Sequence, residues 1–567
     1  MLAPDRIDGL PTSVARPGVR VAAAAVLVVV FATMTFTPAG AIYDPSKNYV
    51  ESPAVAARFP DPATPIATPA LRPNRRNFTG QADMMKFLDE LAARTPDMRM
   101  QLAGLSQEDR AIPLVIFAHP PARSATELAA NGKLTVLVIG QQHGNEPAGG
   151  EAALALALQL AGERRAVLDR VNVLIVPVAN PDGAQNYTRG TLNGFDVNRD
   201  HLLQWTPEGR ALGRIFAAYQ PAVVIDSHEF GVKTRWFEKF DAVQRYDVLI
   251  QYATVPNLAP AIAEASEKMF RVPLARALDA AGFAHSWYFA TSYDMNDRKV
   301  SMGGVVPDTG RNVAGLRNAV SFLVETRGVG LGLAHLRRRV ESHLVANNAI
   351  IDITARNAAA IMALEKRARD DVVAAAGKGE FVVAGAATPG RNTLIMLDPE
   401  TGADKPVEVD WSNALEIRPT LTRVRPYGYL LPASQAAAAD RLRNLGVTIL
   451  RVGGDGMADV ERFRIAGAVV AKKDDVRRND EDDAINVVNL TTVIEKATLP
   501  VRAGDLYVPL DQPLGNVIAA ALEPDTQSSY AANYALTFPG PRDPDRYVRV
   551  YRVVSPLRMP TGPWSGL

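Results

Sequence analysis

Short apolar segments alternate with helical patterns between residue 78 and about residue 330 of this 567-residue chain. The apolar segments read LTVLVIG, VNVLIVPV, PAVVID and AVSFLVET, and the helical patterns between them include EAALALALQLAGE and ALGRIFAAYQ. Buried strands that alternate with helices are typical of an α/β layer. The pattern therefore predicts a mixed, mostly parallel sheet that is flanked by helices.

The pattern of residues changes after a long helical stretch. Residues 333–376 are rich in Arg, Glu and Ala and contain no Pro or Gly. Beyond Gly377, short strand-like segments such as EFVVAG, NTLIML, VTILRV and FRIAGAVVA alternate with Pro and Gly turns. We therefore expect a domain over residues 78–376, closed by the long helical stretch, and a smaller β-rich C-terminal domain over residues 377–567. The charge run 472–483 is expected to be a solvated loop.

The N-terminus has the pattern of an export signal. Arg16 and Arg20 precede 16 uncharged residues, 21–36, and Ala39-Gly40-Ala41 fits the small-residue cleavage pattern. The alternative is an uncleaved membrane anchor, because 23 uncharged residues separate Arg20 from Asp44. Either interpretation places the body of the protein outside the cytoplasm, in the periplasm or secreted, with no other contact with the membrane. The Pro-rich residues 42–77 are expected to form a linker or a strap over the surface.

Composition excludes several classes of function. The formal net charge is +1, so the chain has no overall electrostatic signature of a nucleic-acid partner. It contains no cysteine, which excludes disulfides, a thiol nucleophile and a Cys-ligated metal or iron–sulfur site. Any metal site must therefore be built from carboxylates and the seven histidines.

Two segments together supply such a set of ligands. His143 and Glu146 lie three residues apart, after an apolar strand and before a helix, and His228 ends the apolar segment PAVVIDSH. Either signal alone is weak. Ligands of open α/β sheets gather at the carboxyl ends of the strands, so both segments are expected to meet there. A His-Glu-His set leaves a fourth position open, as in catalytic zinc sites, and such ligands suit zinc.

Residues that could bind a carboxylate group, and one that could act as a general base, occur further along the chain. NPDG, residues 180–183, is a turn motif, and Asp196-Val197-Asn198-Arg199 clusters hydrogen-bonding groups around an arginine, the side chain best suited to grip a carboxylate. Glu325 follows the apolar run FLV, where a carboxylate needs a partner or a function. Its alternative role is an ion pair with Arg327.

Taken in order, these motifs resemble the zinc metallocarboxypeptidases of the carboxypeptidase A type. The resemblance covers roughly residues 78–335. The chain also resembles the related deacylases of the succinylglutamate desuccinylase and aspartoacylase type. The resemblance to the carboxypeptidases implies a zinc carboxypeptidase fold, one Zn²⁺ per chain, and a peptide substrate with a free C-terminal carboxylate. His143, Glu146 and His228 match the zinc ligands. Glu325 matches the general base that deprotonates zinc-bound water and passes the proton to the leaving amine.

The resemblance also assigns the residues around the metal. Arg189 resembles the arginine that stabilises the oxyanion, and Asp196 resembles the carboxylate that orients the first zinc histidine. Asn198 and Arg199 resemble the pair that holds the substrate's terminal carboxylate. The family's substrate-capping tyrosine has no counterpart in SMGGVVPDTGRN, residues 301–312. Arg311 is therefore a further candidate for substrate binding, although a structural role is equally open, and the side-chain preference cannot be transferred.

Three functions are compatible with these residues. The favoured one is an exported zinc metallocarboxypeptidase acting on peptides, with cell-wall peptides among the candidate substrates. The second is a zinc amidohydrolase that deacylates N-acyl amino acids with the same residues. The third is a catalytically inactive module that binds peptides or glycans.

Overall fold

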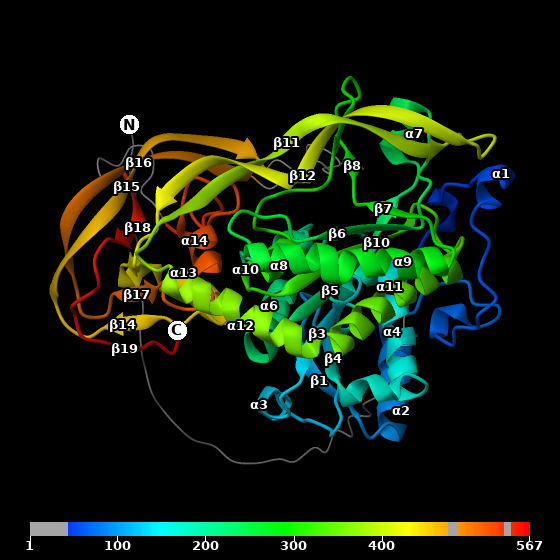
Figure 1. Ribbon diagram of the computed structural model, residues 1–567, viewed down its shortest axis with the longest axis horizontal. Helices are drawn as coiled ribbons and strands as arrows, with labels where there is room; N and C mark the ends of the chain where they lie inside the picture. The colour runs from blue at the N-terminus through cyan, green and yellow to red at the C-terminus, as the bar shows by residue number, and fades with distance from the viewer. Residues whose placement is uncertain (1–42, 474–485, 538–545, 567) are drawn as a thin grey trace, which may run out of the picture. The chain divides into compact units, whose positions relative to one another are not determined.

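A computed structural model describes residues 43–473, 486–537 and 546–566 (Figure 1). The expected signal peptide, residues 1–41, and most of the charge run 472–483 lie outside these ranges. Within the described ranges, no helix combines the length and apolar character needed to cross a bilayer.

An eight-stranded sheet forms the centre of the fold, in the order β1-β2-β4-β3-β5-β10-β6-β7. Its middle strands β4, β3, β5 and β10 pair in parallel, as do β6 and β7, whereas β1–β2, β2–β4 and β10–β6 are antiparallel. The predicted mixed, mostly parallel sheet is confirmed. The strands are β1 Met98–Leu105, β2 Ala111–Phe117, β3 Leu134–Ile139, β4 Val171–Val176, β5 Val223–Gly231, β6 Val248–Tyr252, β7 His285–Trp287 and β10 Val320–Val329.

Helices cover both faces of this sheet. Alternate residues of β3 show why the segment is apolar throughout: Val136 and Val138 pack into one hydrophobic cluster and Leu137 and Ile139 into another. The first cluster contains side chains of α2 Gln81–Arg94, α4 Pro147–Ala161, α9 Val272–Ala280 and α11 Leu336–Arg356. The second contains side chains of α3 Ala125–Ala130, α6 Pro207–Tyr219 and α10 Gly310–Leu316.

Two further sheets are built mainly from strands that follow the long helical stretch, which is two helices, α11 and α12 Ala358–Ala374; two short strands of the first of these sheets precede it. A four-stranded sheet has the order β11-β12-β9-β8, and a seven-stranded sheet has the order β16-β15-β18-β13-β17-β14-β19. The expected β-rich C-terminal part is therefore present as a separate sheet. The strands are β8 Ala290–Thr291, β9 Lys299–Ser301, β11 Glu380–Leu397, β12 Asp404–Val424, β13 Gly428–Leu431, β14 Leu450–Val452, β15 Gly456–Lys472, β16 Asn486–Val501, β17 Leu506–Pro509, β18 Tyr547–Val553 and β19 Thr561–Pro563.

One expectation about these strands is wrong. EFVVAG and NTLIML are not two short strands but parts of the single strand β11, which forms a long hairpin with β12 (Figure 1). Pro389 and Gly390, which suggested a turn, lie inside the strand. β11 is an edge strand, and its pairing with β12 shifts register between Ala387 and Thr388. An edge with such irregularities tolerates a proline that a central strand would exclude.

The remaining helices are short connections and one pair in the C-terminal part. They are α1 Pro53–Ala56, α5 Pro181–Asn186, α7 Thr234–Phe240, α8 Pro260–Ala265, α13 Ala436–Asn444 and α14 Gly515–Leu522. The Pro-rich segment that includes α1 is anchored by a buried side chain. The Glu51 carboxylate forms ion pairs with Arg327 of β10 and with His335. Glu51 therefore ties this segment to the strand that carries Glu325.

Candidate metal centre and substrate site

Three elements of the central layer bring His143, Glu146 and His228 together. His143 lies in the loop after β3, Glu146 is the residue before α4, and His228 lies near the carboxyl end of β5. The loop that carries His143 packs closely on the NPDG turn: a Cβ at Gly144 would lie 1.8 Å from the backbone of Gly183. Only glycine fits this approach, so the turn motif serves to hold the loop of the first histidine.

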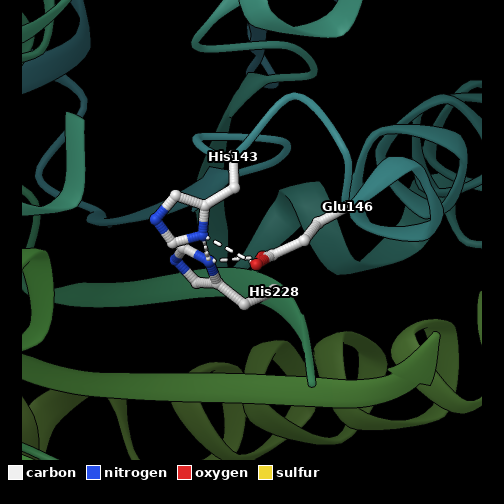
Figure 2. A group of neighbouring side chains, drawn as sticks. All are labelled: His143, Glu146 and His228. Atoms are coloured by element: carbon white, nitrogen blue, oxygen red, sulfur yellow. Dashed lines mark hydrogen bonds and ion pairs between the residues drawn. The ribbon is translucent and has the colours of Figure 1, made fainter. Parts of the chain in front are cut away.

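The three side chains point toward one another (Figure 2). Nδ1 of His143 lies 2.9 Å from Oε1 of Glu146, and Nδ1 of His228 lies 2.9 Å from Oε2 of the same carboxylate. The two Nδ1 atoms are 3.0 Å apart. All three residues are buried. The arrangement meets the geometric requirements of a metal site built from one atom of each residue.

Each histidine turns its other ring nitrogen to a carboxylate. Nε2 of His143 lies 2.9 Å from Oδ1 of Asp196, and Nε2 of His228 lies 2.8 Å from Oδ1 of Asp226. Such an outer carboxylate fixes the tautomer in which the inner nitrogen can bind a metal. Asp196 was predicted from the sequence, whereas Asp226 was not. The available signal was its place two residues before His228, on the same face of a strand.

The charges around the cluster favour a cation. Burial tends to raise the pKa of Glu146, but His143 and His228 outweigh it and hold that pKa well below its ordinary value. Burial tends to lower the pKa of His228, but Asp226 and Glu146 outweigh it and raise that pKa to about 10. Positive charge is therefore stabilised at the point where the three ligand atoms meet.

Zinc fits this donor set. Ligand atoms about 2.0–2.1 Å from a tetrahedral zinc ion lie about 3.3–3.4 Å apart, a few tenths of an ångström more than the separations observed. Two imidazole nitrogens and one carboxylate oxygen are donors that zinc prefers, and the outer carboxylates complete the arrangement. Small side-chain shifts would open the cluster to the ion.

Arg189 borders the same point. Its guanidinium donates to Oδ2 of Asp196 at 2.8 Å and lies 3.3 Å from both Oε1 of Glu146 and Nδ1 of His143. About a third of its side chain is exposed. Asp196 thus bridges His143 and Arg189, and Arg189 presents positive charge beside the cluster.

Asn198 and Arg199 lie on the other side of His228. The Asn198 amide nitrogen is 3.1 Å from Nε2 of His228, and its oxygen accepts from the backbone N–H of Gly310 at 2.7 Å. Nε of Arg199 lies 3.9 Å from Oδ2 of Asp308. Arg311 of α10 is buried and donates to the Gly304 carbonyl at 3.0 Å. Arg199 and Arg311 both line the same cavity.

Glu325 lies beside His228 on the neighbouring strand. The two residues pair in register between the parallel strands β10 and β5, so their side chains leave the sheet on the same side. Both are buried. Arg327, considered above as a partner of Glu325, forms an ion pair with Glu51. Glu229 uses the opposite face, where it binds Arg339.

His201 has a place that the sequence did not reveal. His201 is buried. Its Nε2 lies 2.7 Å from Oε1 of Gln142, and the Gln142 amide donates to Asp226. His201 and Gln142 thus extend the chain of hydrogen bonds that begins at His228.

Sequence comparisons with known carboxypeptidases agree with this site. A family described as zinc carboxypeptidase matches residues 84–223. Carboxypeptidase 2 of Trichophyton rubrum is 27% identical over 466 residues, which cover 80% of this chain and 83% of that protein. Carboxypeptidase 2 of Trichophyton equinum is 26% identical over 508 residues, covering 86% and 92%. The solved structure of a putative carboxypeptidase A from Shewanella denitrificans is 18% identical, covering 48% of this chain and 70% of that one, with a TM-score of 0.37.

The α/β layer, the buried His-Glu-His cluster and these sequence relatives define a zinc-dependent peptide hydrolase. More particularly, residues 84–223 match the zinc carboxypeptidase family and the chain is similar to carboxypeptidases over most of its length, which supports a zinc metallocarboxypeptidase.

Proposed function

We propose that this protein is an exported carboxypeptidase that removes the C-terminal residue of peptides, with zinc held by His143, Glu146 and His228. The observation that carries the proposal is the buried cluster itself, in which three ligand atoms converge and both imidazoles are backed by carboxylates. Zinc, when bound, supplies a Lewis acid that polarises the scissile carbonyl and activates water.

Glu325 acts as the general base. It accepts a proton from the attacking water and returns it to the leaving amine, and a buried carboxylate next to the cluster suits both steps. The Pro-rich segment supports this role, because its Glu51 forms an ion pair with Arg327, the residue that was considered as an ion-pair partner of Glu325.

Arg189 stabilises the negative charge that develops on the carbonyl oxygen. Its guanidinium lies at the edge of the cluster and is oriented by Asp196, so it needs little reorganisation when the charge appears. Asp196 also orients His143.

Asn198 and Arg199 hold the substrate's terminal carboxylate, with Arg311 as a third contact. The two arginines line one cavity, and Asn198, which precedes Arg199 in the chain, lies 3.1 Å from His228. An arginine can bind a carboxylate through two parallel hydrogen bonds, which would fix the scissile bond next to Glu325.

Export rests on the N-terminal pattern of residues 16–41. It would place the enzyme in the periplasm or outside the cell, where nutrient peptides and cell-wall peptides are the available substrates. The division into a catalytic domain over residues 78–376 and a C-terminal domain over residues 377–567 is part of the same proposal.

Metal analysis coupled to peptide hydrolysis tests the function. We expect about one zinc per chain in the purified protein and release of free amino acids from a mixed peptide pool. His143→Ala should lose both, whereas His285→Ala, at the sheet edge on β7, should lose neither. Zinc binding with turnover of N-acyl amino acids but not of peptides would replace the proposal by a deacylase. Zinc binding without any turnover would favour a binding module.

A further inference from the structure

A second cavity, of about 220 Å³, lies at the end of the central sheet opposite the metal cluster. Pro221 lies shortly before the start of β5 and Arg317 shortly before the start of β10, and both residues line this cavity. These are the amino ends of two parallel strands, whereas His228 of the metal cluster lies near the carboxyl end of β5. The cavity is therefore separate from the candidate metal centre.

Three parts of the chain form the walls of this cavity. Arg317 belongs to the central layer and Arg369 to α12, while Thr448 and Gln512 belong to the C-terminal part. The Gln512 side chain accepts from the Thr448 N–H at 2.8 Å and donates to the Thr448 carbonyl at 3.0 Å. The Arg317 guanidinium donates to the Leu445 carbonyl at 2.7 Å. These hydrogen bonds hold the C-terminal wall together and attach it to the central layer.

Two arginines line the cavity, and their charges are only partly balanced. Arg317 is buried, and in the part of the chain that the structure describes it forms no ion pair with a carboxylate. Arg369 forms an ion pair with Glu365 and donates to the Gln220 side-chain oxygen at 3.0 Å. Nε of Arg369 is buried and has no hydrogen-bond acceptor among the described residues. The walls therefore carry an unbalanced positive charge and a donor without an acceptor.

The lining of the cavity supplies no negative charge. Among the described residues that line it are Gln220, Thr448 and Gln512, but no Asp or Glu. Burial lowers the pKa of Arg317 to about 10, and the positive charge of Arg369 acts in the same direction. The Arg317 guanidinium nevertheless stays protonated at neutral pH. A buried cation without a counter-charge is costly, so an anion that enters this cavity would be stabilised.

We propose that this cavity is a binding site for a small oxyanion of the phosphate type, held by Arg317 and Arg369 and bordered by Gln220. Guanidinium groups bind phosphate through paired hydrogen bonds. The two arginines come from separate elements, and phosphate offers acceptor oxygens on all sides, whereas a carboxylate offers its oxygens in one plane. Gln220 and Thr448 are exposed, so the cavity can be reached from solvent.

A bound anion would connect the central layer, α12 and the C-terminal part, because each of them contributes to the walls. A ligand that binds only the folded state stabilises that state, so the site would strengthen the attachment of the C-terminal part. The inference does not rest on the proposed peptidase function, since these residues lie outside the metal cluster and the proposed substrate site.

Phosphate binding to the full-length, zinc-loaded protein tests this site. At constant ionic strength, equilibrium dialysis with inorganic phosphate should show saturable, stoichiometric binding, and Tm should rise with the phosphate concentration. Acetate, which makes fewer charge-assisted hydrogen bonds, should bind about 10-fold more weakly.

Gln220→Glu is the decisive variant. It places a carboxylate of the same size beside Arg369, where it competes with the anion, so the affinity for phosphate should fall by about 10–100-fold. Tm in phosphate-free buffer should not fall, because the contact with Arg369 is kept. Arg317→Lys keeps the charge but loses the paired donors and should bind phosphate about 10-fold more weakly. Arg367→Gln, at an exposed position of α12, is the matched control and should bind phosphate like the wild type.

Three results would overturn the inference. Equal phosphate binding by the wild type and Gln220→Glu would place the anion elsewhere, such as at the metal centre. Absence of phosphate binding by the wild type would remove the site, and acetate binding as tight as that of phosphate would contradict the assignment to a phosphate-type anion. Phosphate also stabilises proteins by its exclusion from their surface. The rise in Tm must therefore be larger in the wild type than in Gln220→Glu, and equal rises would contradict the proposal.

Discussion

Nε2 of His228 lies 2.8 Å from Oδ1 of Asp226, two residues earlier on the same strand. This contact orients the ring so that Nδ1 faces His143 and Glu146. Because a carboxylate partner fixes the tautomer and raises the basicity of a ligating histidine, its loss commonly weakens metal binding about 10–100-fold.

We therefore expect Asp226→Asn to weaken zinc binding by about 10–100-fold while the protein stays folded. The measurement is the zinc dissociation constant, obtained by competition with a chelator of known affinity. Asp297→Asn serves as the control, because it neutralises another ion-paired carboxylate, a partly buried one whose partner is Lys239. Equal zinc affinity in the Asp226 variant and the wild type would show that the contact does not support the metal.

Glu325→Gln should separate chemistry from metal binding. The amide keeps the size of the side chain but cannot accept the proton, so kcat should fall by about 10²–10⁴-fold. Zinc content should stay at the wild-type level, because Glu325 lies beside the cluster of three ligands rather than within it. Metal analysis and steady-state kinetics on the same preparation check both statements. Loss of zinc in this variant would instead make Glu325 part of the metal site.

Arg199→Gln should weaken recognition of the substrate's free carboxylate. A hydrogen bond to a charged group contributes about 1.5–3 kcal/mol, so kcat/KM for a free peptide should fall by about 10–150-fold. The variant should also lose most of the discrimination between a peptide and its C-terminal amide. Arg391→Gln, at an exposed position of β11, provides the matched control. Retained discrimination in the Arg199 variant would assign the carboxylate to Arg311 or Arg189.

The residues that sequence alone could place are those with a local signal. His143 and Glu146 lie in one turn, and His228 ends an apolar strand. Because the carboxyl ends of parallel strands meet at one edge of a sheet, these positions were enough to predict the cluster of three ligands. Asp226 was missed although strand periodicity could have found it. The wall of the cavity beside Arg199 could not be found in this way, because Asn257 of that wall contacts Val382 and Asn516 across 125 and 259 positions of the chain. β11 was divided wrongly because Pro389 and Gly390 carry the same local signal inside an irregular edge strand as in a turn.

Burial of His201 makes stability depend on pH in a defined direction. Burial lowers the pKa of His201 to about 4 in the folded protein, whereas the unfolded value is about 6.5. The folded state therefore binds fewer protons than the unfolded state between these values, so stability is full above about pH 6.5 and is lost as the pH falls toward 4. At pH 5 the loss from this residue is about 2 kcal/mol. The measurement is the free energy of unfolding in urea of the metal-free protein at pH 7 and at pH 5. Between these pH values, His201→Gln should lose about 2 kcal/mol less of this free energy than the wild type. An identical loss in both proteins would mean that His201 is already charged in the folded state.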